Sequence, residues 1–382
     1  MTDHPHIPFN RPTFLGTETE LVERTLNRQK IGPGGEYSKS CQDWLGDTFD
    51  TQLALPTGSC TAALEMAAML LDLMPGDEVI MPSFGYPSTA NAFVRVGASP
   101  VFVDIEPATM NIDPCAVEAA ISSRTRAVVP IHYGGQPADM DAIMGIASRY
   151  NLVVVEDAAN AFLAQHRGRY CGTIGALGCF SFHETKAVHC GQGGALLIND
   201  PAYLARAEIL LEKGTDRRNF IRGEVDRYTW KDIGSAYSLD DIRAAFLFAQ
   251  LQASAVTTGK RLALWQAYRQ GLAGLADEGK IEIPQPVADC STNGMIFWLK
   301  ASTNVERDDL IATLARHGVH CVFHYIPLHS AVAGQRFGRF HGDDIYTSED
   351  SSRLVRLPMF DGLEDIDRIV RLIHAFYSDA LR

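Results

Sequence analysis

Between residues 52 and 211, short apolar runs alternate with segments in which apolar residues recur at helical spacing. The runs are rich in Val, Ile and Leu, as in QLALP (52–56), PVFVDI (100–105) and NLVVVEDAA (151–159). Strands that are apolar on both faces and are separated by helices of roughly ten residues are typical of a mainly parallel sheet covered on both sides. The sequence therefore predicts an α/β fold built around a large, mostly parallel sheet.

The pattern changes near residue 250, where a long helical stretch gives way to shorter helices and isolated strand-like segments. We predict a large domain over residues 1–250 and a smaller C-terminal α+β domain over residues 251–382. The length of 382 residues supports this division, because single hydrophobic cores stop growing at roughly 250–300 residues. We see no flexible linker, so we expect the two parts to pack together.

Composition narrows the classes of function. The net charge of -12 argues against nucleic acid or an anionic membrane surface as the main partner. The N-terminus shows no secretory signal, and no apolar stretch approaches the roughly 20 residues needed to span a bilayer. The eight cysteines have no metal-like spacing with histidine, so we expect reduced thiols in a cytoplasmic protein and no metal site.

Ligands of open α/β sheets collect at the carboxyl ends of the strands, and three such ends here carry polar residues. The first is the turn of Ser59, Cys60, Thr61 and Ala62, which opens a helix. Its N–H groups and hydroxyls suit a phosphate, although simple helix capping requires the same residues. The second is Asp157, which lies just beyond the four apolar residues 152–155 and needs a cationic or hydrogen-bonding partner. A helix cap or a structural ion pair would explain Asp157 equally well.

The third strand end carries Lys186, the only lysine between residues 40 and 212. It follows the apolar run 177–182 and precedes a glycine-rich turn. Most lysines are solvated surface residues, but a lysine that is removed from water can lose its proton and form a Schiff base.

A phosphate cradle, a buried aspartate and a buried lysine are together what pyridoxal phosphate requires. Asp157 would keep the pyridine nitrogen protonated, and Lys186 would hold the aldehyde as an imine. Tyr86, in the loop after residues 77–82, could lie against the ring, although aromatic residues in such loops often only pack.

Several motifs resemble the DegT/StrS-type, pyridoxal-phosphate-dependent nucleotide-sugar aminotransferases, and the likeness covers nearly the whole chain. The motifs are GSCTAALEMA, PGDEVIMPS, VFVDIEPATMNID, VVVEDAA, GCFSFHETK, GGALLIND and FHYIPLH. Within this family the chain is most similar to the enzymes that aminate C4 of a dTDP-4-keto-6-deoxyhexose, and the distinctive stretches are FSFHETK, EKGTDRRNFIRGEVDRYTWKDIGSAY and VFHYIPLHS. The resemblance implies the aspartate-aminotransferase-like fold (fold type I) and a homodimer with shared active sites. It also implies a nucleotide-sugar substrate and an amino-acid donor, most simply glutamate.

The same resemblance implies roles for individual residues. Lys186 would be the catalytic, imine-forming lysine, Asp157 the partner of the pyridinium nitrogen, and Tyr86 the stacking aromatic. The cofactor phosphate would contact Ser59, Cys60, Thr61, Ala62 and Ser181, and the sugar nucleotide would contact Tyr325 and His329. The lysine implies transamination, because some relatives with histidine at this position instead dehydrate the sugar.

Two positions depart from the family pattern. Asn160 stands where the family usually has a glutamine that hydrogen-bonds the cofactor's ring hydroxyl, so this contact either passes through water or is lost. The family stretch GYNYR, whose asparagine reaches the partner subunit's phosphate, is here GSAYS (234–238). Ala236 cannot make that bond, and Ser235 is the candidate substitute.

Other functions are weaker interpretations of the same sequence. A nucleotide-dependent oxidoreductase would need a strand before the glycines of GPGGEYS (32–38) and a different spacing. A metal hydrolase could use His132, Asp139 and Asp141, but these positions also fit a strand end and a helix cap. A non-catalytic sugar-nucleotide-binding protein and amination at C3 of a keto-sugar stay open. His183 and His324 could touch the substrate or simply pack.

Overall fold

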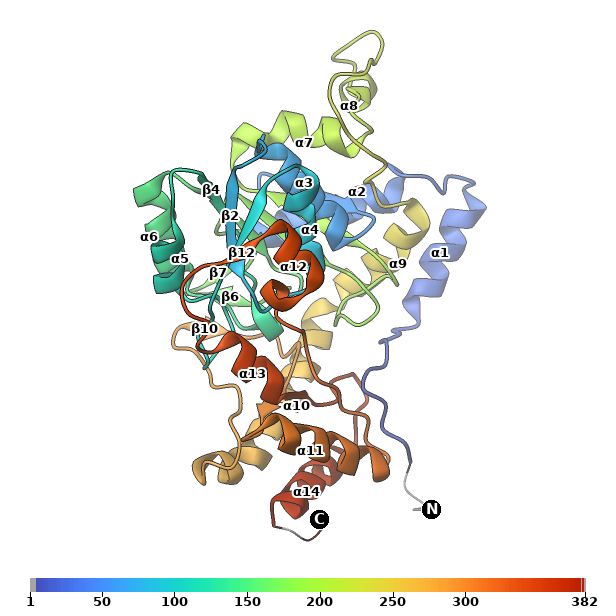
Figure 1. Ribbon diagram of the computed structural model, residues 1–382. Helices are drawn as coiled ribbons and strands as arrows, with labels where there is room; N and C mark the ends of the chain where they lie inside the picture. The colour runs from blue at the N-terminus through green and yellow to red at the C-terminus, as the bar shows by residue number, and fades with distance from the viewer. Residues whose placement is uncertain (1–4, 379, 381–382) are drawn as a thin grey trace.

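The computed structural model describes residues 5–378 and 380, and it confirms an α/β fold with a large, mostly parallel sheet (Figure 1). The sheet has eight strands in the order β1-β9-β8-β5-β4-β2-β3-β12. They are β1 (Leu53–Thr57), β2 (Glu78–Pro82), β3 (Ser99–Val103), β4 (Thr125–Val128), β5 (Val153–Asp157), β8 (Leu177–Ser181), β9 (Gly194–Ile198) and β12 (Arg339–Phe340). All neighbours run parallel except those of β9, which is antiparallel to both β8 and β1.

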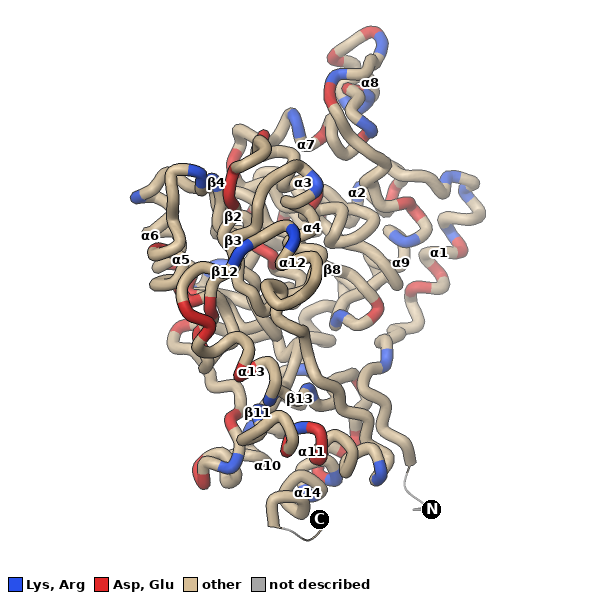
Figure 2. The backbone as a smooth tube through the Cα atoms, in the orientation of Figure 1, with Lys and Arg blue, Asp and Glu red and all other residues tan. Residues whose placement is uncertain are grey.

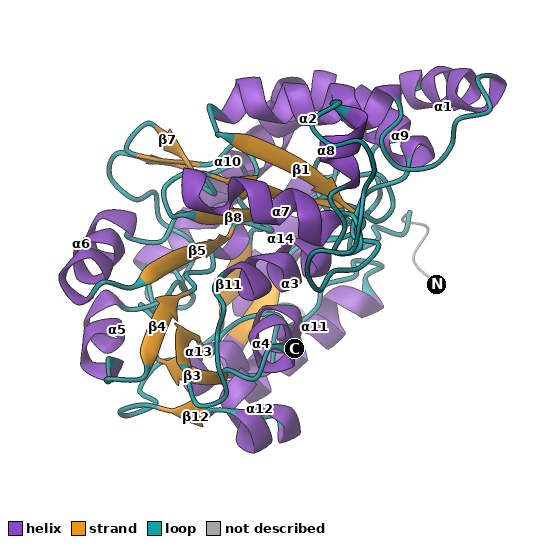
Figure 3. Ribbon diagram, turned by 90° about the horizontal axis from the view of Figure 1, so that it is seen from above, coloured by secondary structure: helices purple, strands orange, loops and turns teal. Residues whose placement is uncertain are grey.

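Helices cover both faces of this sheet (Figure 3). Successive strand residues point to opposite faces, so strands that are apolar throughout must be covered on both sides. One face packs against α3 (Cys60–Leu70), α4 (Pro87–Arg95) and α7 (Leu204–Leu211). The other packs against α2 (Glu36–Phe49), α5 (Pro114–Ala120), α6 (Met140–Tyr150) and α9 (Asp241–Gln252).

A second hydrophobic core lies in the C-terminal part of the chain. It is formed by α10 (Ser254–Asp277), α11 (Asn304–Arg316), α14 (Ile366–Tyr377) and the antiparallel pair β11 (Trp298–Lys300) and β13 (Leu354–Arg356). Ile7, near the other end of the chain, also packs in this core. A separate core of this kind is expected for a smaller C-terminal domain, and the boundary at residue 250 stays a prediction.

The C-terminal part also returns to the large sheet, where β12 pairs with β3. Asp104, just after β3, accepts hydrogen bonds from the backbone N–H groups of Ile345 (3.0 Å), Tyr346 (3.0 Å) and Thr347 (2.8 Å). The Thr347 hydroxyl donates a fourth, at 2.6 Å. One buried carboxylate therefore holds the segment that leads into α13 (Thr347–Arg353) and β13 against the sheet.

The remaining elements are short or peripheral. They are α1 (Thr17–Asn27), α8 (Arg217–Ile221), α12 (Val332–Phe337), β6 (Gln165–His166), β7 (Arg169–Tyr170), β10 (Cys290–Ser291) and the 3-10 turns η1 (Tyr133–Gly135), η2 (Pro201–Tyr203) and η3 (Leu328–Ser330). Within the described part of the chain, no helix combines the length and the apolar character needed to cross a bilayer.

Candidate active site

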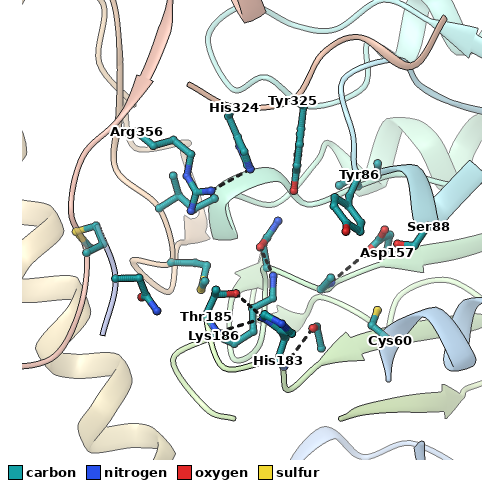
Figure 4. Close-up of a pocket in the computed structure, with 18 of the residues that line it drawn as sticks. Cys60, Tyr86, Ser88, Asp157, His183, Thr185, Lys186, His324, Tyr325 and Arg356 are labelled. Atoms are coloured by element: carbon teal, nitrogen blue, oxygen red, sulfur yellow. Dashed lines mark hydrogen bonds between the residues drawn. The ribbon is translucent and has the colours of Figure 1, made fainter. Parts of the chain in front are cut away.

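The polar strand ends meet in a cavity of about 450 Å³, which residues of the large sheet and of the C-terminal part line together (Figure 4). Nine of the residues predicted for the site line it. They are Ser59, Cys60, Thr61, Tyr86, Asp157, Asn160, Ser181, Lys186 and Tyr325. Ala62 and His329 are not among the lining residues. Eight of these nine residues belong to the part of the chain that forms the large sheet, Tyr325 belongs to the C-terminal part, and the role of each stays a prediction.

Lys186 follows β8 and projects into this cavity (Figure 4). Its Nζ donates a hydrogen bond to Asn160 Oδ1 at 2.7 Å. Burial lowers the pKa of Lys186 to about 8, and the positive charges of Arg356 and Arg261 act in the same direction. A substantial fraction of the amine is therefore neutral at mildly alkaline pH, which is the form that reacts as a nucleophile or base.

Asp157 ends β5 and is only 5% exposed. Its Oδ2 accepts a 2.6 Å hydrogen bond from the Thr89 hydroxyl, and its Oδ1 accepts one from the backbone N–H of Ala159 at 3.1 Å. It forms no ion pair with any lysine, arginine or histidine among residues 5–378 and 380. A buried carboxylate without a counter-ion is costly, so this geometry leaves room for a cationic ligand group.

The turn before α3 both caps the helix and offers a suitable position for a phosphate. Ser59 caps the helix, because its hydroxyl accepts the N–H of Ala62 at 3.1 Å. Cys60 and Thr61 line the cavity at the helix N-terminus, where unpaired N–H groups favour an anion. A Cβ on Gly194 of β9 would lie 2.4 Å from Cys60 N, so only glycine allows the strand to approach this turn. Ser181, at the end of β8, completes the polar end of the cavity.

Two tyrosines form another part of the wall. Tyr86 is the residue before α4, and its ring centre lies 6.1 Å from that of Tyr325. Burial raises the pKa of Tyr325 to about 12, so its hydroxyl keeps its proton at neutral pH. Both rings border the space above Asp157 and Lys186 in Figure 4, where a flat ligand ring could lie.

The structure places His329 away from the cavity lining. Its Nδ1 lies 2.6 Å from the Ser83 hydroxyl and its Nε2 lies 3.2 Å from Asp344 Oδ2, while its ring packs on Phe340. Its predicted contact with the sugar nucleotide stays a prediction. His183 and His324 do line the cavity.

The three residues considered for a metal hydrolase have other partners. His132 pairs with Glu156 at 2.9 Å, Asp139 caps α6, and Asp141 forms ion pairs with Arg167 and Arg169. Among the described residues, no group of three or more His, Cys, Asp or Glu side chains is arranged to hold a metal ion. These contacts favour the structural interpretation of all three positions.

A comparison with models of known protein families identifies the family of this chain. The model of the DegT/DnrJ/EryC1/StrS aminotransferase family matches residues 14–374. The chain belongs to this family. The predicted enzyme class, a pyridoxal-phosphate-dependent sugar aminotransferase, is thereby confirmed, and so is the type I fold.

Solved structures agree with this assignment. The aminotransferase TlmJ from Streptoalloteichus hindustanus is 28% identical, with 98% of this chain and 100% of that chain covered and a TM-score of 0.90. DesV from S. venezuelae, solved in complex with a ketimine intermediate, is 30% identical (98% and 99% covered, TM-score 0.89). A putative sugar aminotransferase from Streptococcus pneumoniae, solved in its PMP form, is 25% identical (98% and 100% covered, TM-score 0.87).

The residues of this aminotransferase fit pyridoxal phosphate on their own geometry. Asp157 is buried and has no counter-ion among the described residues, and a protonated pyridine nitrogen would supply one. The turn at Cys60 and Thr61 offers a helix N-terminus to the phosphate, and Gly194 keeps that approach open. Lys186 has the lowered pKa that imine formation requires.

Sequence analysis of this aminotransferase missed three residues of the site. Thr89 holds Asp157, but a threonine in the first turn of a helix usually suggests capping. Arg261 and Arg356 line the cavity from the C-terminal part. Nothing in their local sequence distinguishes them from surface arginines, so only the packing of distant segments reveals them.

Proposed function

We propose that this aminotransferase transfers an amino group from an amino acid, most simply glutamate, to C4 of a dTDP-4-keto-6-deoxyhexose. The observation that carries the proposal is one cavity that contains Lys186, whose pKa is lowered, and Asp157, which has no counter-ion in the part of the chain that the structure describes. The choice of C4 rests on the resemblance of residues 180–186, 212–237 and 322–330 to enzymes that act at this carbon.

When bound, pyridoxal phosphate supplies the carbon that exchanges the amino group and a ring that withdraws electrons from it. Asp157, oriented by Thr89, would accept a hydrogen bond from the pyridine N–H and keep that nitrogen protonated. Cys60, Thr61 and Ser181 would bind the phosphate. Tyr86 would cover one face of the ring and exclude water from it.

Lys186 would carry the proton transfers. Its Nζ would take the proton from Cα of the amino-acid donor and, in the second half-reaction, deliver a proton to C4 of the sugar. Asn160 would keep the amine in place, since its Oδ1 already accepts the Nζ hydrogen bond at 2.7 Å. In this protein the side chain at position 160 would thus position the lysine. In the family, the longer glutamine at this position usually contacts the ring hydroxyl of the cofactor.

A homodimer with shared active sites is also part of the proposal. Residues 212–236, which include α8, project from the body of the molecule (Figure 1). Their side chains include Trp230, which is 81% exposed, Ile221 (64%) and Ile233 (57%). Ser235 and Ala236, at the end of this segment, are exposed and so could approach a second subunit. We place the enzyme in the cytoplasm, where its free cysteines would stay reduced.

The test is to incubate the holoenzyme with dTDP-4-keto-6-deoxyglucose and glutamate and to analyse the product by NMR. We expect an amino group at C4, formed with one configuration, and no product from the Lys186→Ala variant. If only a 3-keto isomer is aminated, the enzyme acts at C3 of the sugar and not at C4. Failure of the cofactor absorbance to change with any amino acid would indicate a non-catalytic binding protein.

A further inference from the structure

The Asn160 side chain, which contacts Lys186, lies in a segment without regular secondary structure. Residues 158–164 follow β5 as a series of turns. Asn160 is buried, and its Oδ1 accepts the hydrogen bond from Lys186 Nζ at 2.7 Å. Because neither a helix nor a sheet ladder fixes these turns, other contacts must set the position of Asn160 Oδ1.

Asn293, from the C-terminal part of the chain, supplies such a contact. Its Nδ2 donates hydrogen bonds to the backbone carbonyls of Asn160 at 2.8 Å and of Phe162 at 2.9 Å. In the described part of the chain, no backbone N–H donates to either carbonyl. Asn293 Oδ1 accepts the backbone N–H of Met295 at 3.0 Å, so both ends of this buried amide are satisfied. These partners also fix which end of the amide is the nitrogen.

The segment that carries Asn293 is itself held from two sides. Arg261 of α10 donates from Nη2 to the Met295 carbonyl at 3.0 Å. On the other side, a Cβ on Gly135 would lie 1.8 Å from Asn293 Oδ1, so only glycine lets the amide come this close. Asn293 is therefore a rigid support for residues 160–162.

We propose that Asn293 is a positioning residue of the active site, which fixes residues 160–162 so that Asn160 Oδ1 meets Lys186 Nζ. The inference rests on the proposed role of Lys186 in proton transfer, but not on the identity of the sugar or on C4. Asn293 is not among the residues that line the cavity. It therefore acts through Asn160 and not by touching the substrate or the cofactor.

The hydrogen bond to Asn160 has two consequences for the amine of Lys186. An oxygen acceptor stabilises a charged amine more than a neutral one, so loss of this contact lowers the pKa of Lys186 further. The loss also leaves Nζ free to turn away from the reacting carbon. The other charged or titratable groups around the amine stay the same in the variants described below; they are Cys60, Asp157, Arg261, His324 and Arg356.

A purely structural role of Asn293 is the alternative, and the chain offers a matched control for it. In that case Asn293 only fastens the C-terminal part to the large sheet, and its loss lowers stability without changing Lys186. Asn199 also donates from Nδ2 to two backbone carbonyls, those of Gly172 at 3.0 Å and Gly175 at 2.8 Å. It follows the end of β9 that is opposite to the phosphate turn, so its loss removes the same kind of contact away from the site.

The decisive measurement is the pKa of Lys186 in the cofactor-free protein. It is obtained from the pH dependence of acetylation by acetic anhydride, with mass spectrometry of the peptide that contains Lys186. We expect Asn293→Leu, which removes the amide at nearly constant size, to lower this pKa by at least about half a pH unit. Asn160→Ala should lower it by a similar amount. Because Asn293 acts through Asn160, the double variant should have the same pKa as Asn160→Ala alone.

The controls separate positioning from stability. We expect Asn199→Leu to unfold at lower urea concentration than the wild type but to keep the wild-type pKa of Lys186. An unchanged or raised pKa in Asn293→Leu, a further shift in the double variant, or an equal shift in Asn199→Leu would overturn the proposal. If Asn293→Leu does not fold, Asn293→Ser, which keeps one donor, should lower the pKa in the same direction, and no shift there would reject the proposal.

The donor half-reaction tests the consequence for catalysis. With L-glutamate and no sugar, we expect the maximal rate of the cofactor absorbance change to fall at least about tenfold in Asn293→Leu. The glutamate concentration that gives half of this rate should change less than about twofold, because Asn293 does not touch the donor. Asn199→Leu should match the wild type in both. A wild-type maximal rate in Asn293→Leu would contradict the positioning role.

Failure of this inference and failure of the proposed function are separable, because the measurement on Lys186 needs neither cofactor nor substrate. If the pKa shifts as expected but the keto-sugar is not aminated, the assigned acceptor is wrong and the role of Asn293 stands. If the sugar is aminated at C4 while Asn293→Leu keeps the wild-type pKa and rate, the proposed function stands and the role of Asn293 is wrong.

Discussion

At the scale of single residues, the site depends on charges that the fold keeps away from water. Lys186 is close enough to Arg356 and Arg261 for their charges to oppose its own, while Asp157 favours the charged amine. The direction of the net effect is set by burial, which lowers the pKa of Lys186 to about 8. At neutral pH the buried, charged Lys186 amine therefore destabilises the fold. Its neutral form is the one that can act as a nucleophile or base in the cavity.

This cost predicts a pH-dependent difference between the cofactor-free wild type and Lys186→Met. Below about pH 8, Lys186 is charged in both the folded and the unfolded state, and the fold bears the full penalty. As the pH rises from 8 towards 10.5, the unfolded lysine binds more protons than the folded one, so the wild type gains stability relative to the variant. We expect the variant to be more stable at pH 7 by about 1–3 kcal/mol, with the difference shrinking towards pH 10.

Urea unfolding of the two proteins between pH 7 and pH 10 measures this difference. A gap in the free energy of unfolding that stays constant across this range would show that Lys186 is not held in a water-poor environment. Lys39→Met, at an exposed lysine in α2, is the control and should give no such pH dependence.

The residues that sequence analysis could identify are those whose local context already shows their burial. Lys186 and Asp157 each lie just beyond a run of mainly apolar residues. The sequence therefore indicates that both charges are at least partly removed from water. Arg356 lies 170 residues beyond Lys186 in the chain, and it reaches the cavity because Asp104 holds the segment before β13 against the sheet. No local pattern encodes that contact.

At the scale of elements, the direction of β9 sets the shape of the site. A parallel connection needs a crossover of a dozen or more residues, usually a helix, and residues 182–193 contain none. The chain therefore turns back, and β9 lies antiparallel between β8 and β1. The sequence predicted the strands and the mostly parallel sheet, but this reversal follows from the short, helix-free connection that carries Lys186.

The close approach of β9 to the turn before α3 predicts that one added methyl group at Gly194 disturbs the site. In Gly194→Ala, the added Cβ would lie 2.4 Å from Cys60 N and 2.6 Å from Ser59 O, and both are backbone atoms that cannot rotate away. The turn that faces the phosphate must shift, so we expect cofactor affinity to fall at least tenfold and stability to fall by about 1–3 kcal/mol. Spectroscopic titration with pyridoxal phosphate and thermal unfolding measure the two effects.

Gly46→Ala is the matched control for this variant. Gly46 lies within α2, and a Cβ there would meet no atom within 4 Å. Because alanine favours a helix over glycine, we expect a gain of about 0.5–1 kcal/mol in stability and unchanged cofactor affinity. If Gly194→Ala binds the cofactor as the wild type does, the close approach of β9 is not what shapes the phosphate turn.

At the scale of the whole molecule, the projecting segment of residues 212–236 leaves apolar side chains exposed to water in an isolated subunit. It exposes three large apolar side chains, Trp230, Ile221 and Ile233, and exposed apolar surface is a feature of interaction sites. The segment also carries charges of both signs, as Figure 2 shows around α8, which is typical of the polar rim of an interface. A second copy of the chain is the partner that our proposal requires, because it would bring Ser235 towards the other active site.

This interpretation predicts that Ile233→Glu weakens the dimer without unfolding the subunit. Ile233 is 57% exposed, so the glutamate is solvated in a monomer but would be desolvated without a counter-ion in an interface. We expect light scattering at micromolar concentration to give a dimer for the wild type and mostly monomer for the variant, with unchanged circular dichroism. Val305→Glu changes a valine in α11 that is 65% exposed, and this control should remain dimeric. If Ile233→Glu also remains dimeric, the subunits meet through another surface and Ser235 cannot complete the partner's site.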